Sequence, residues 1–134
     1  MDEIAGRRFL TNRVMTATPA QRVVMLYDRA VLDIARARAE FAAGDTVAGS
    51  EHAMHALAVV SELRCVLDTS RWDGAAQLAG LYDWILSGLI SARTGNCDTR
   101  LVHISDILTS LRAAWAEAAE KVNGLAPMAL GSAV

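Results

Sequence analysis

Residues 18–41 read TPAQRVVMLYDRAVLDIARARAEF, and this stretch decides the fold. Thr18 can cap a helix, Pro19 suits its first position, and Gln21 completes a capping box. Apolar side chains then recur every three or four residues, which places them on one face of that helix. They are Val23, Tyr27, Ala30, Ile34, Ala37 and Phe41. The stretch therefore predicts one long amphipathic helix with a single apolar stripe.

Three more stretches follow the same pattern. Gly44 can end the first helix, Asp45 can cap a second over 46–67, a third is expected over 74–93, and Asp98 can cap a fourth that ends near residue 123. The predicted stripes are Ala56, Val60, Leu63 and Leu67 in the second helix, Leu78, Leu81, Tyr82, Ile85, Leu89 and Ile90 in the third, and Leu101, Ile104, Leu108, Leu111, Trp115, Ala118 and Val122 in the fourth. Short connections place sequential helices antiparallel.

The sequence therefore predicts an all-α protein, an antiparallel up-down-up-down four-helix bundle over residues 18–123. Residues 1–17 are expected to form an N-terminal arm, and residues 124–134 a flexible tail. The arm is apolar for a free segment, since it contains Ile4, Phe9, Leu10, Val14 and Met15. We expect it to lie in a groove of the bundle as a movable flap.

The composition of the chain argues against several classes of protein. A chain of 134 residues is long enough for one domain with a core. A formal net charge of −2 argues against a nucleic-acid partner, which would require a clustered basic excess. No apolar run reaches about 18 residues and the N-terminus lacks a signal-peptide core, so neither membrane insertion nor secretion is expected. Cys65 and Cys97 are predicted to be free thiols, and the chain to be cytoplasmic.

No pattern for catalysis emerges. A di-iron bundle needs Glu-x-x-His on two helices, and that motif does not occur. His52 and His55 lie three residues apart in EHAMH, which is at most an incomplete metal site. A solvated polar face is the preferred interpretation of this pair, and His103 is expected at the edge of the core. The prediction is a protein without enzyme activity, cofactor or metal.

The triplet Leu-Tyr-Asp occurs twice, at 26–28 and 81–83. Each tyrosine lies on a predicted apolar stripe, and each aspartate, one position later, points about 100° away. The residues favour a packed tyrosine beside a solvated or salt-bridged aspartate. A ligand site remains the alternative.

The segments NRVMTATPAQRVVMLYD, GAAQLAGLYDWI and LTSLRAAW together resemble the flagellar secretion chaperone family, FliS. The matching positions are Asn12, Val14, Thr16, Ala17, Thr18, Pro19, Met25, Leu26, Tyr27, Asp28, Leu81, Tyr82, Asp83, Trp84, Ile85, Leu111, Arg112 and Trp115. The sequence departs from the family pattern at Phe9, Arg22, Trp84 and Arg93.

The resemblance implies an export chaperone that binds the disordered C-terminal segment of flagellin, prevents its premature polymerisation and delivers it to the membrane protein of the flagellar type III export gate. The flagellin-binding residues that it implies are Phe9, Val14, Leu26, Tyr27, Asp28, Leu81, Tyr82, Trp84 and Ile85. Ile4 and Phe9 are the implied contacts with the cytosolic domain of the export gate. A helical scaffold that self-associates through the same apolar faces is the alternative.

Overall fold

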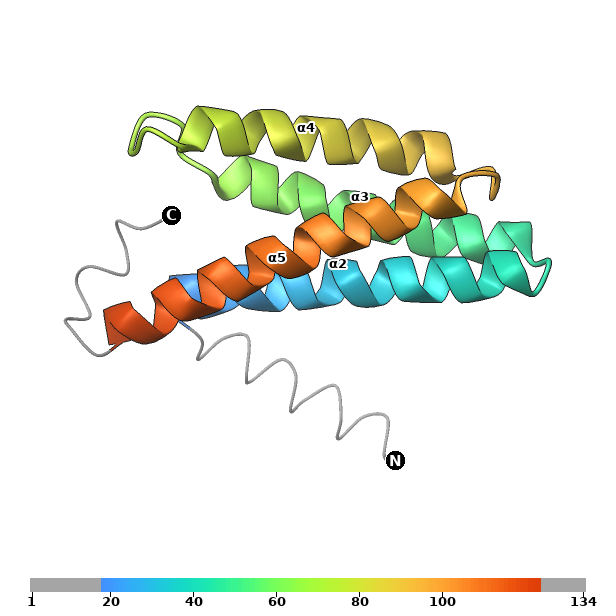
Figure 1. The fold of residues 1–134 in the computed structure, drawn as a ribbon, viewed down its shortest axis with the longest axis horizontal. Coiled ribbons are helices and arrows are strands. Elements are labelled where there is room, and N and C mark those ends of the chain that lie inside the picture. The colour runs from blue at the N-terminus through green and yellow to red at the C-terminus, as the bar shows by residue number, and fades with distance from the viewer. Residues whose placement is uncertain (1–17, 124–134) are drawn as a thin grey trace.

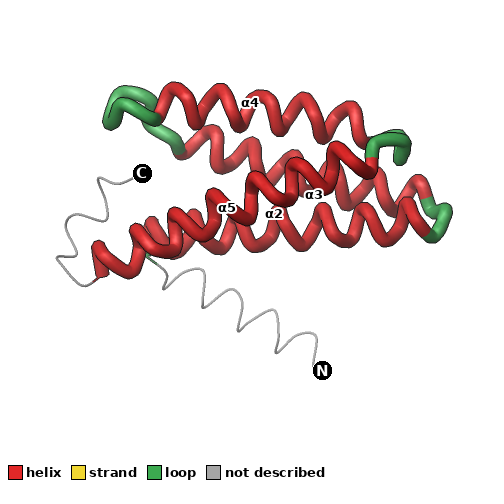
Figure 2. Tube along the Cα trace, viewed as in Figure 1, coloured by secondary structure: helices red, strands yellow, loops and turns green. Residues whose placement is uncertain are grey.

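The computed structural model describes residues 18–123, and these residues form four α-helices. The helices, labelled as in Figure 1, are α2 (Pro19–Ala42), α3 (Thr46–Val66), α4 (Ala75–Ala92) and α5 (Asp98–Asn123). Consecutive helices run in opposite directions along one long axis, and short loops join them at the ends (Figure 2). The predicted all-α antiparallel bundle is confirmed. The predicted arm at 1–17 and tail at 124–134 lie outside the described residues.

Local sequence signals start and end the helices as expected. The Thr18 hydroxyl accepts a hydrogen bond from the Gln21 amide at 3.2 Å, and the Gln21 side chain accepts one from the Thr18 amide at 3.0 Å. Gly44 has a φ of 85°, in the region that favours glycine, and ends α2. The Asp45 carboxylate then accepts from the Ala48 amide at 3.0 Å and caps α3. The capping box and the second cap are thus both confirmed.

The start of α5 differs from the prediction. Asp98 lies within the first turn, where the Leu101 amide bonds to the Cys97 carbonyl at 3.1 Å. The Asp98 carboxylate accepts from Arg38 of α2 at 2.7 and 3.3 Å, and this bond lowers the pKa of Asp98. An arginine on a neighbouring helix therefore takes the carboxylate that was expected to cap α5.

The core is built from the predicted stripes, with two corrections. Ile90 is 48% exposed, because the buried residues of α4 step by four and three through Leu89 to Ala92 and leave Ile90 about 100° off that line. In α5 Ala119 is buried and Ala118 is exposed. A straight helix has 3.6 residues per turn, so a seven-residue stripe drifts by about 20° per repeat and the next residue turns inward. The side chain of Val122 lies outside the described part.

The four helices do not contact one another equally. α2 packs against α3 and α5, and α4 packs against the same two helices, so α2 and α4 lie on a diagonal. The α4–α5 contact is the smallest of these four. Figure 1 shows the reason: α5 starts beside the end of α4 and then crosses away, toward the beginning of α2. The first half of α4 and the second half of α5 therefore diverge.

The α2–α3 and α4–α5 loops lie at the same end of the bundle, which we call the loop end. One aromatic ring packs on two glycines there. A Cβ atom on Gly49 would lie 2.4 Å from the ring of Phe41, and one on Gly95 would lie 2.9 Å from it. These distances are shorter than carbon atoms tolerate, so the Phe41 ring occupies space that the two glycines leave free.

We predict that Gly49→Ala destabilises the bundle by about 1–2 kcal/mol, since overpacking outweighs the helix propensity gained. Gly80→Ala is the matched control, because no atom lies within 4 Å of a Cβ added there. It should stabilise by about 0.5–1 kcal/mol. Urea unfolding measures both, and Phe41→Leu should restore stability to Gly49→Ala. Equal stabilisation by the two alanine substitutions would contradict the packing of Phe41 described here.

Candidate functional site

The two Leu-Tyr-Asp triplets meet in the middle of the core. Tyr27 of α2 and Tyr82 of α4 are 0% and 1% exposed, and their hydroxyl groups are hydrogen-bonded to each other. The ring centroids are 6.4 Å apart with an interplanar angle of 44°. This bond satisfies polar atoms that would otherwise be buried without a partner.

Burial changes the acidity of both tyrosines. Loss of solvent raises the pKa of Tyr27 well above its ordinary value, and the neighbouring Tyr82 raises it further. Burial also raises the pKa of Tyr82, while the hydrogen bond with Tyr27 partly lowers it. Either hydroxyl group can be the donor in this bond. Both hydroxyl groups stay protonated at neutral pH, and neither is exposed to a substrate.

The aspartates of the triplets point outward and join neighbouring helices. Asp28 pairs with Arg112 of α5 at 2.8 Å, and Asp83 pairs with Arg64 of α3 at 3.2 Å. The interpretation of the triplets as a packed tyrosine beside a salt-bridged aspartate is confirmed. They are parts of one scaffold.

A buried carboxylate joins α2 to α3, and the sequence interpretation missed it. Asp33 is fully buried, its Oδ2 is hydrogen-bonded to Nδ1 of His55, and Nε of Arg29 lies 3.2 Å from its Oδ1. His55 is 51% exposed, in agreement with the solvated polar face expected at 52–55, but that expectation did not include its hydrogen bond to this carboxylate. The position of Asp33, three residues after Ala30 and four before Ala37, was the available signal.

The contact between α4 and α5 is held differently from the others. Ion pairs cross from α2 to α5 and from α3 to α4, and the hydrogen bond between Asp33 and His55 joins α2 to α3. Within residues 18–123 no ion pair joins α4 to α5. The rings of Trp84 and His103 instead meet edge to face, with centroids 5.4 Å apart. His103 is exposed, beyond the edge of the core where the sequence placed it.

An apolar groove of about 480 Å³ opens where these two helices diverge. It is lined by Trp72, Gly74, Gln77, Leu78, Leu81, Leu111, Ala114, Trp115 and Ala118. Gln77 is the one polar side chain in that set, and the lining carries no charge. Gly74 makes room for Trp72, whose ring would lie 2.4 Å from a Cβ at that position. The groove can therefore take an apolar side chain at little desolvation cost, and it would strongly disfavour a charged one.

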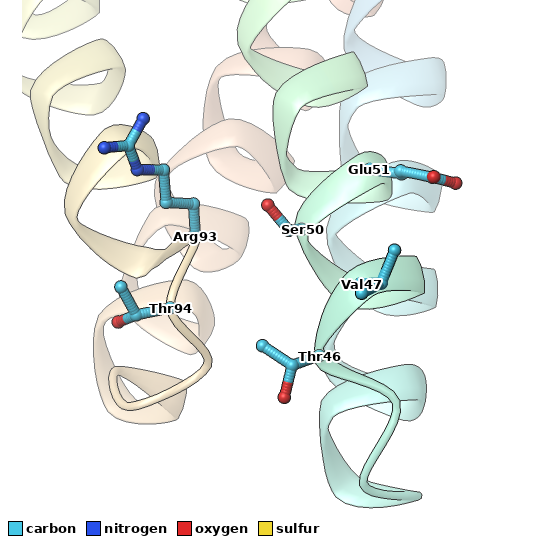
Figure 3. Close-up of a pocket in the computed structure, with 6 residues that line it drawn as sticks. All are labelled: Thr46, Val47, Ser50, Glu51, Arg93 and Thr94. Carbon is cyan, nitrogen blue, oxygen red and sulfur yellow. The ribbon is translucent and has the colours of Figure 1, made fainter.

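A second hollow of about 600 Å³ lies at the loop end of the bundle, between the start of α3 and the end of α4 (Figure 3). It is lined by Thr46, Val47, Ser50, Glu51, Arg93 and Thr94. In Figure 3 Glu51 points away from Arg93, and the lining consists of surface side chains. No described side chain in it is both polar and buried, so this hollow offers no built site.

The predicted flagellin-binding residues differ in their location and burial in the structure. Leu81 lines the apolar groove, and Trp84 is 44% exposed on the same helix. Tyr27, Tyr82 and Ile85 are buried. Leu26 is half-buried and Asp28 is exposed. Ile4, Phe9 and Val14 lie outside the described residues, and all these contacts stay predictions.

Comparison of the chain with known proteins identifies its family. A family model described as "Flagellar protein FliS" matches residues 3–122. The chain belongs to the FliS family. The flagellar secretion chaperone FliS of Salmonella typhimurium (strain LT2) is 30% identical over 112 residues, covering 82% of this chain and 83% of that protein. The protein of the same name from Bacillus subtilis (strain 168) is 27% identical over 107 residues, covering 80% of each chain.

Membership confirms the resemblance read from the three sequence motifs, and it supports a chaperone role. The described residues contain no group of three or more His, Cys, Asp or Glu side chains that could hold a metal ion. No helix in residues 18–123 is long and apolar enough to cross a membrane. Cys65 on α3 and Cys97 before α5 are unpaired.

The raised pKa values of the tyrosines predict a loss of stability at high pH. The folded chain keeps two phenolic protons that the unfolded chain releases above its ordinary pKa of 10.0. Stability should be unaffected by these groups well below pH 10 and should fall above it, by up to about 1.4 kcal/mol per pH unit for Tyr27, with a loss in the same direction from Tyr82. Urea unfolding from pH 8 to pH 11 measures this slope. Tyr27→Phe should make it shallower, and an unchanged slope would refute the assignment.

The buried Asp33 predicts unequal effects of two neighbouring histidines. His55→Ala should cost about 1–3 kcal/mol, because a buried carboxylate loses a hydrogen-bond donor. His52→Ala should change stability by no more than about 0.5 kcal/mol, since its side chain has no such partner. Thermal and urea unfolding of the two variants provide the comparison. Equal costs would show that the bond to Asp33 contributes nothing.

Proposed function

We propose that this chain is a cytoplasmic export chaperone that binds the disordered C-terminal segment of flagellin, prevents its premature polymerisation and delivers it to the flagellar type III export gate. Family membership supports the chaperone role. The observation that carries the binding step is the uncharged groove between α4 and α5. The other helix contacts are crossed by ion pairs or, between α2 and α3, by the hydrogen bond of Asp33 with His55.

The groove favours a client segment that binds as a helix. Its walls are the side chains of α4 and α5, and backbone groups inside a helix already bond to one another. The described residues contain no strand whose edge could pair with an extended peptide. A helical client satisfies its own backbone groups, whereas an extended one would bury them without partners. A disordered segment that folds on docking fits this requirement.

The dimensions of the groove limit the part of the client that it holds. Its lining extends from Gly74 to Leu81 on α4 and from Leu111 to Ala118 on α5. At 1.5 Å per residue, each wall is about 10 Å long, or two helical turns. Two or three large apolar side chains, spaced by three or four residues, would fill it. The small side chains of Ala114 and Ala118 let such residues approach the α5 backbone closely.

The remaining parts of the proposal concern residues beyond the groove. Contacts of Ile4 and Phe9 with the export gate, and of Phe9 and Val14 with flagellin, rest on the family resemblance. Self-association of the bundle as a scaffold would use the same apolar groove. Light scattering after size exclusion separates the two functions, because a chaperone should form a one-to-one complex when the client is added.

Calorimetric titration with the C-terminal segment of the flagellin from the same organism tests the proposal directly. We expect one-to-one binding with a negative heat-capacity change, as apolar surface is buried and the segment folds. Absence of binding at high micromolar concentration would overturn it.

A charge placed in the groove should abolish that binding. Ala114→Glu puts a carboxylate into the apolar lining and should weaken affinity by about 100-fold or more. Ala113→Glu is the matched control, since Ala113 is exposed on the same helix and lies outside the lining. It should bind like the unmodified chain. If both variants bind equally well, the client docks elsewhere.

A further inference from the structure

The groove between α4 and α5 lies at the end of the bundle where α5 ends and the tail (residues 124–134) follows. Its lining on α5 runs from Leu111 to Ala118, and α5 ends at Asn123, five residues later. Figure 1 shows that α5 ends at the same end of the bundle as the loop that precedes α4. At a rise of 1.5 Å per residue, the tail therefore starts about 8 Å from the groove lining.

The tail matches the groove in polarity. It reads GLAPMALGSAV, without a charged side chain, and the groove lining carries no charge either. The N-terminal arm differs, since residues 1–17 contain five charged side chains: Asp2, Glu3, Arg7, Arg8 and Arg13. Placing a charge in an apolar lining is costly. Of these two segments, the tail is therefore the better occupant of the groove.

The tail is long enough to reach the whole groove. Along α5 the lining extends from about 8 to about 18 Å back from Asn123. Met128 and Leu130 follow Asn123 by five and seven residues, so an extended chain can carry them up to about 17 and 23 Å. Gly124 stands directly after the last helical residue, where glycine commonly reverses the chain, and Pro127 cannot continue a helix. The sequence after α5 thus allows a turn back along that helix.

The side chains of the tail alternate in a way that suits a groove with one open side. In an extended segment Met128 and Leu130 point to one side, and Ala129 and Gly131 lie on the other. The Ala114 side of the lining is exposed, so the backbone of such a segment can stay in contact with water at the mouth of the groove. Two side chains alone would then hold the segment. A client helix that fills the groove more completely can displace it.

We propose that the tail docks in the groove between α4 and α5 through Met128 and Leu130, and that it must leave the groove when the client binds. The inference rests on the proposed function as regards the client, whereas docking of the tail concerns this chain alone. The groove is then covered by the chain itself until a client is present, which limits the apolar surface that is exposed to water.

Docking can be measured without a client, because the groove contains its own reporters. In a chain labelled with ¹⁵N, the three tryptophans give three indole N–H signals. Trp72 and Trp115 line the groove, whereas Trp84 lies outside the lining and serves as the internal reference. A side chain that enters or leaves the groove should therefore move the first two signals and leave the third in place.

Two variants of the full chain carry the same added charge on opposite sides of the extended tail. The inward variant combines Met128→Asp with Leu130→Asp, and the outward variant combines Ala129→Asp with Gly131→Asp. The inward variant should move the two groove signals, since a carboxylate is disfavoured in the apolar lining. The outward variant should leave all three signals in place. Unchanged groove signals in the inward variant, or equal shifts in both variants, would overturn the inference.

Other occupants of the groove would give different results. If the N-terminal arm fills it, Phe9→Asp should move the signals of Trp72 and Trp115, and the inward variant should not. If a second copy of the chain fills it, the same signals should change with protein concentration, and light scattering should show a dimer. Either result would contradict docking of the tail.

Competition with the client is measured by calorimetric titration with the same flagellin segment. A groove that the tail fills about 90% of the time is free about 10% of the time, which lowers the apparent client affinity about tenfold. The inward variant should therefore bind the flagellin segment about tenfold more tightly than the unmodified chain, and the outward variant should bind like the unmodified chain. Equal affinity in all three chains, or an equal gain in both variants, would show that tail and client do not compete and would refute the inference.

The outcomes distinguish this inference from the proposed function. If neither the unmodified chain nor the inward variant binds the flagellin segment, the proposed function is wrong, and the indole signals alone decide whether the tail docks. If the flagellin segment binds but the inward variant moves no groove signal, the proposed function stands and the inference is wrong.

Discussion

The hydrogen bond between the hydroxyl groups of Tyr27 and Tyr82 is the constraint on which the rest of the bundle depends. A tyrosine can be buried only where its hydroxyl finds a partner, and here each tyrosine is the partner of the other. The bond joins α2 and α4, the two helices that lie on a diagonal of the bundle. It therefore fixes the rotation of both helices about their axes, and with it the directions in which Asp28 and Asp83 point.

Because of that rotation, the four contacts between helices differ in the side chains that join them. Asp28 reaches Arg112 and Asp83 reaches Arg64, so α2 is tied to α5 and α3 to α4 at the surface. Exposed pairs of this kind contribute little energy each, about 0–1 kcal/mol, and they act mainly by selecting one arrangement of neighbours. Between α4 and α5 no ion pair is found within residues 18–123, the rings of Trp84 and His103 meet edge to face, and α5 crosses away from α4 along its length (Figure 1). An apolar groove without charge is the consequence.

Such a groove suits the client that we propose, which must be held and later released. Apolar burial is not directional, so it tolerates variation in the client side chains, and the absence of charged partners keeps the docking surface independent of a particular ion pair. The ordering of a disordered segment opposes binding, which limits affinity for a given buried area. Both properties are consistent with the chaperone role that family membership supports.

The helices, their caps and most of the core could be predicted from the sequence, because they depend on residues within a few positions of one another. The capping box at Thr18, the glycine end at Gly44 and the stripe from Val23 to Ala37 all follow from local geometry. The family could likewise be identified from three short motifs. Where the sequence prediction was wrong, at Ile90, Ala118 and Asp98, the error came from the exact rotation of a helix or from a partner on another one.

Only the assembled bundle shows which pairs of helices are joined by polar side chains and which pair diverges to leave a groove. The two tyrosines are 55 positions apart, and Asp33 and His55 are 22 positions apart, so no local pattern could pair them. The groove exists because α5 crosses α4 at an angle, and that angle results from the packing of all four helices together. Periodicity specifies which face of a helix is buried, whereas only the assembled bundle specifies what each face meets.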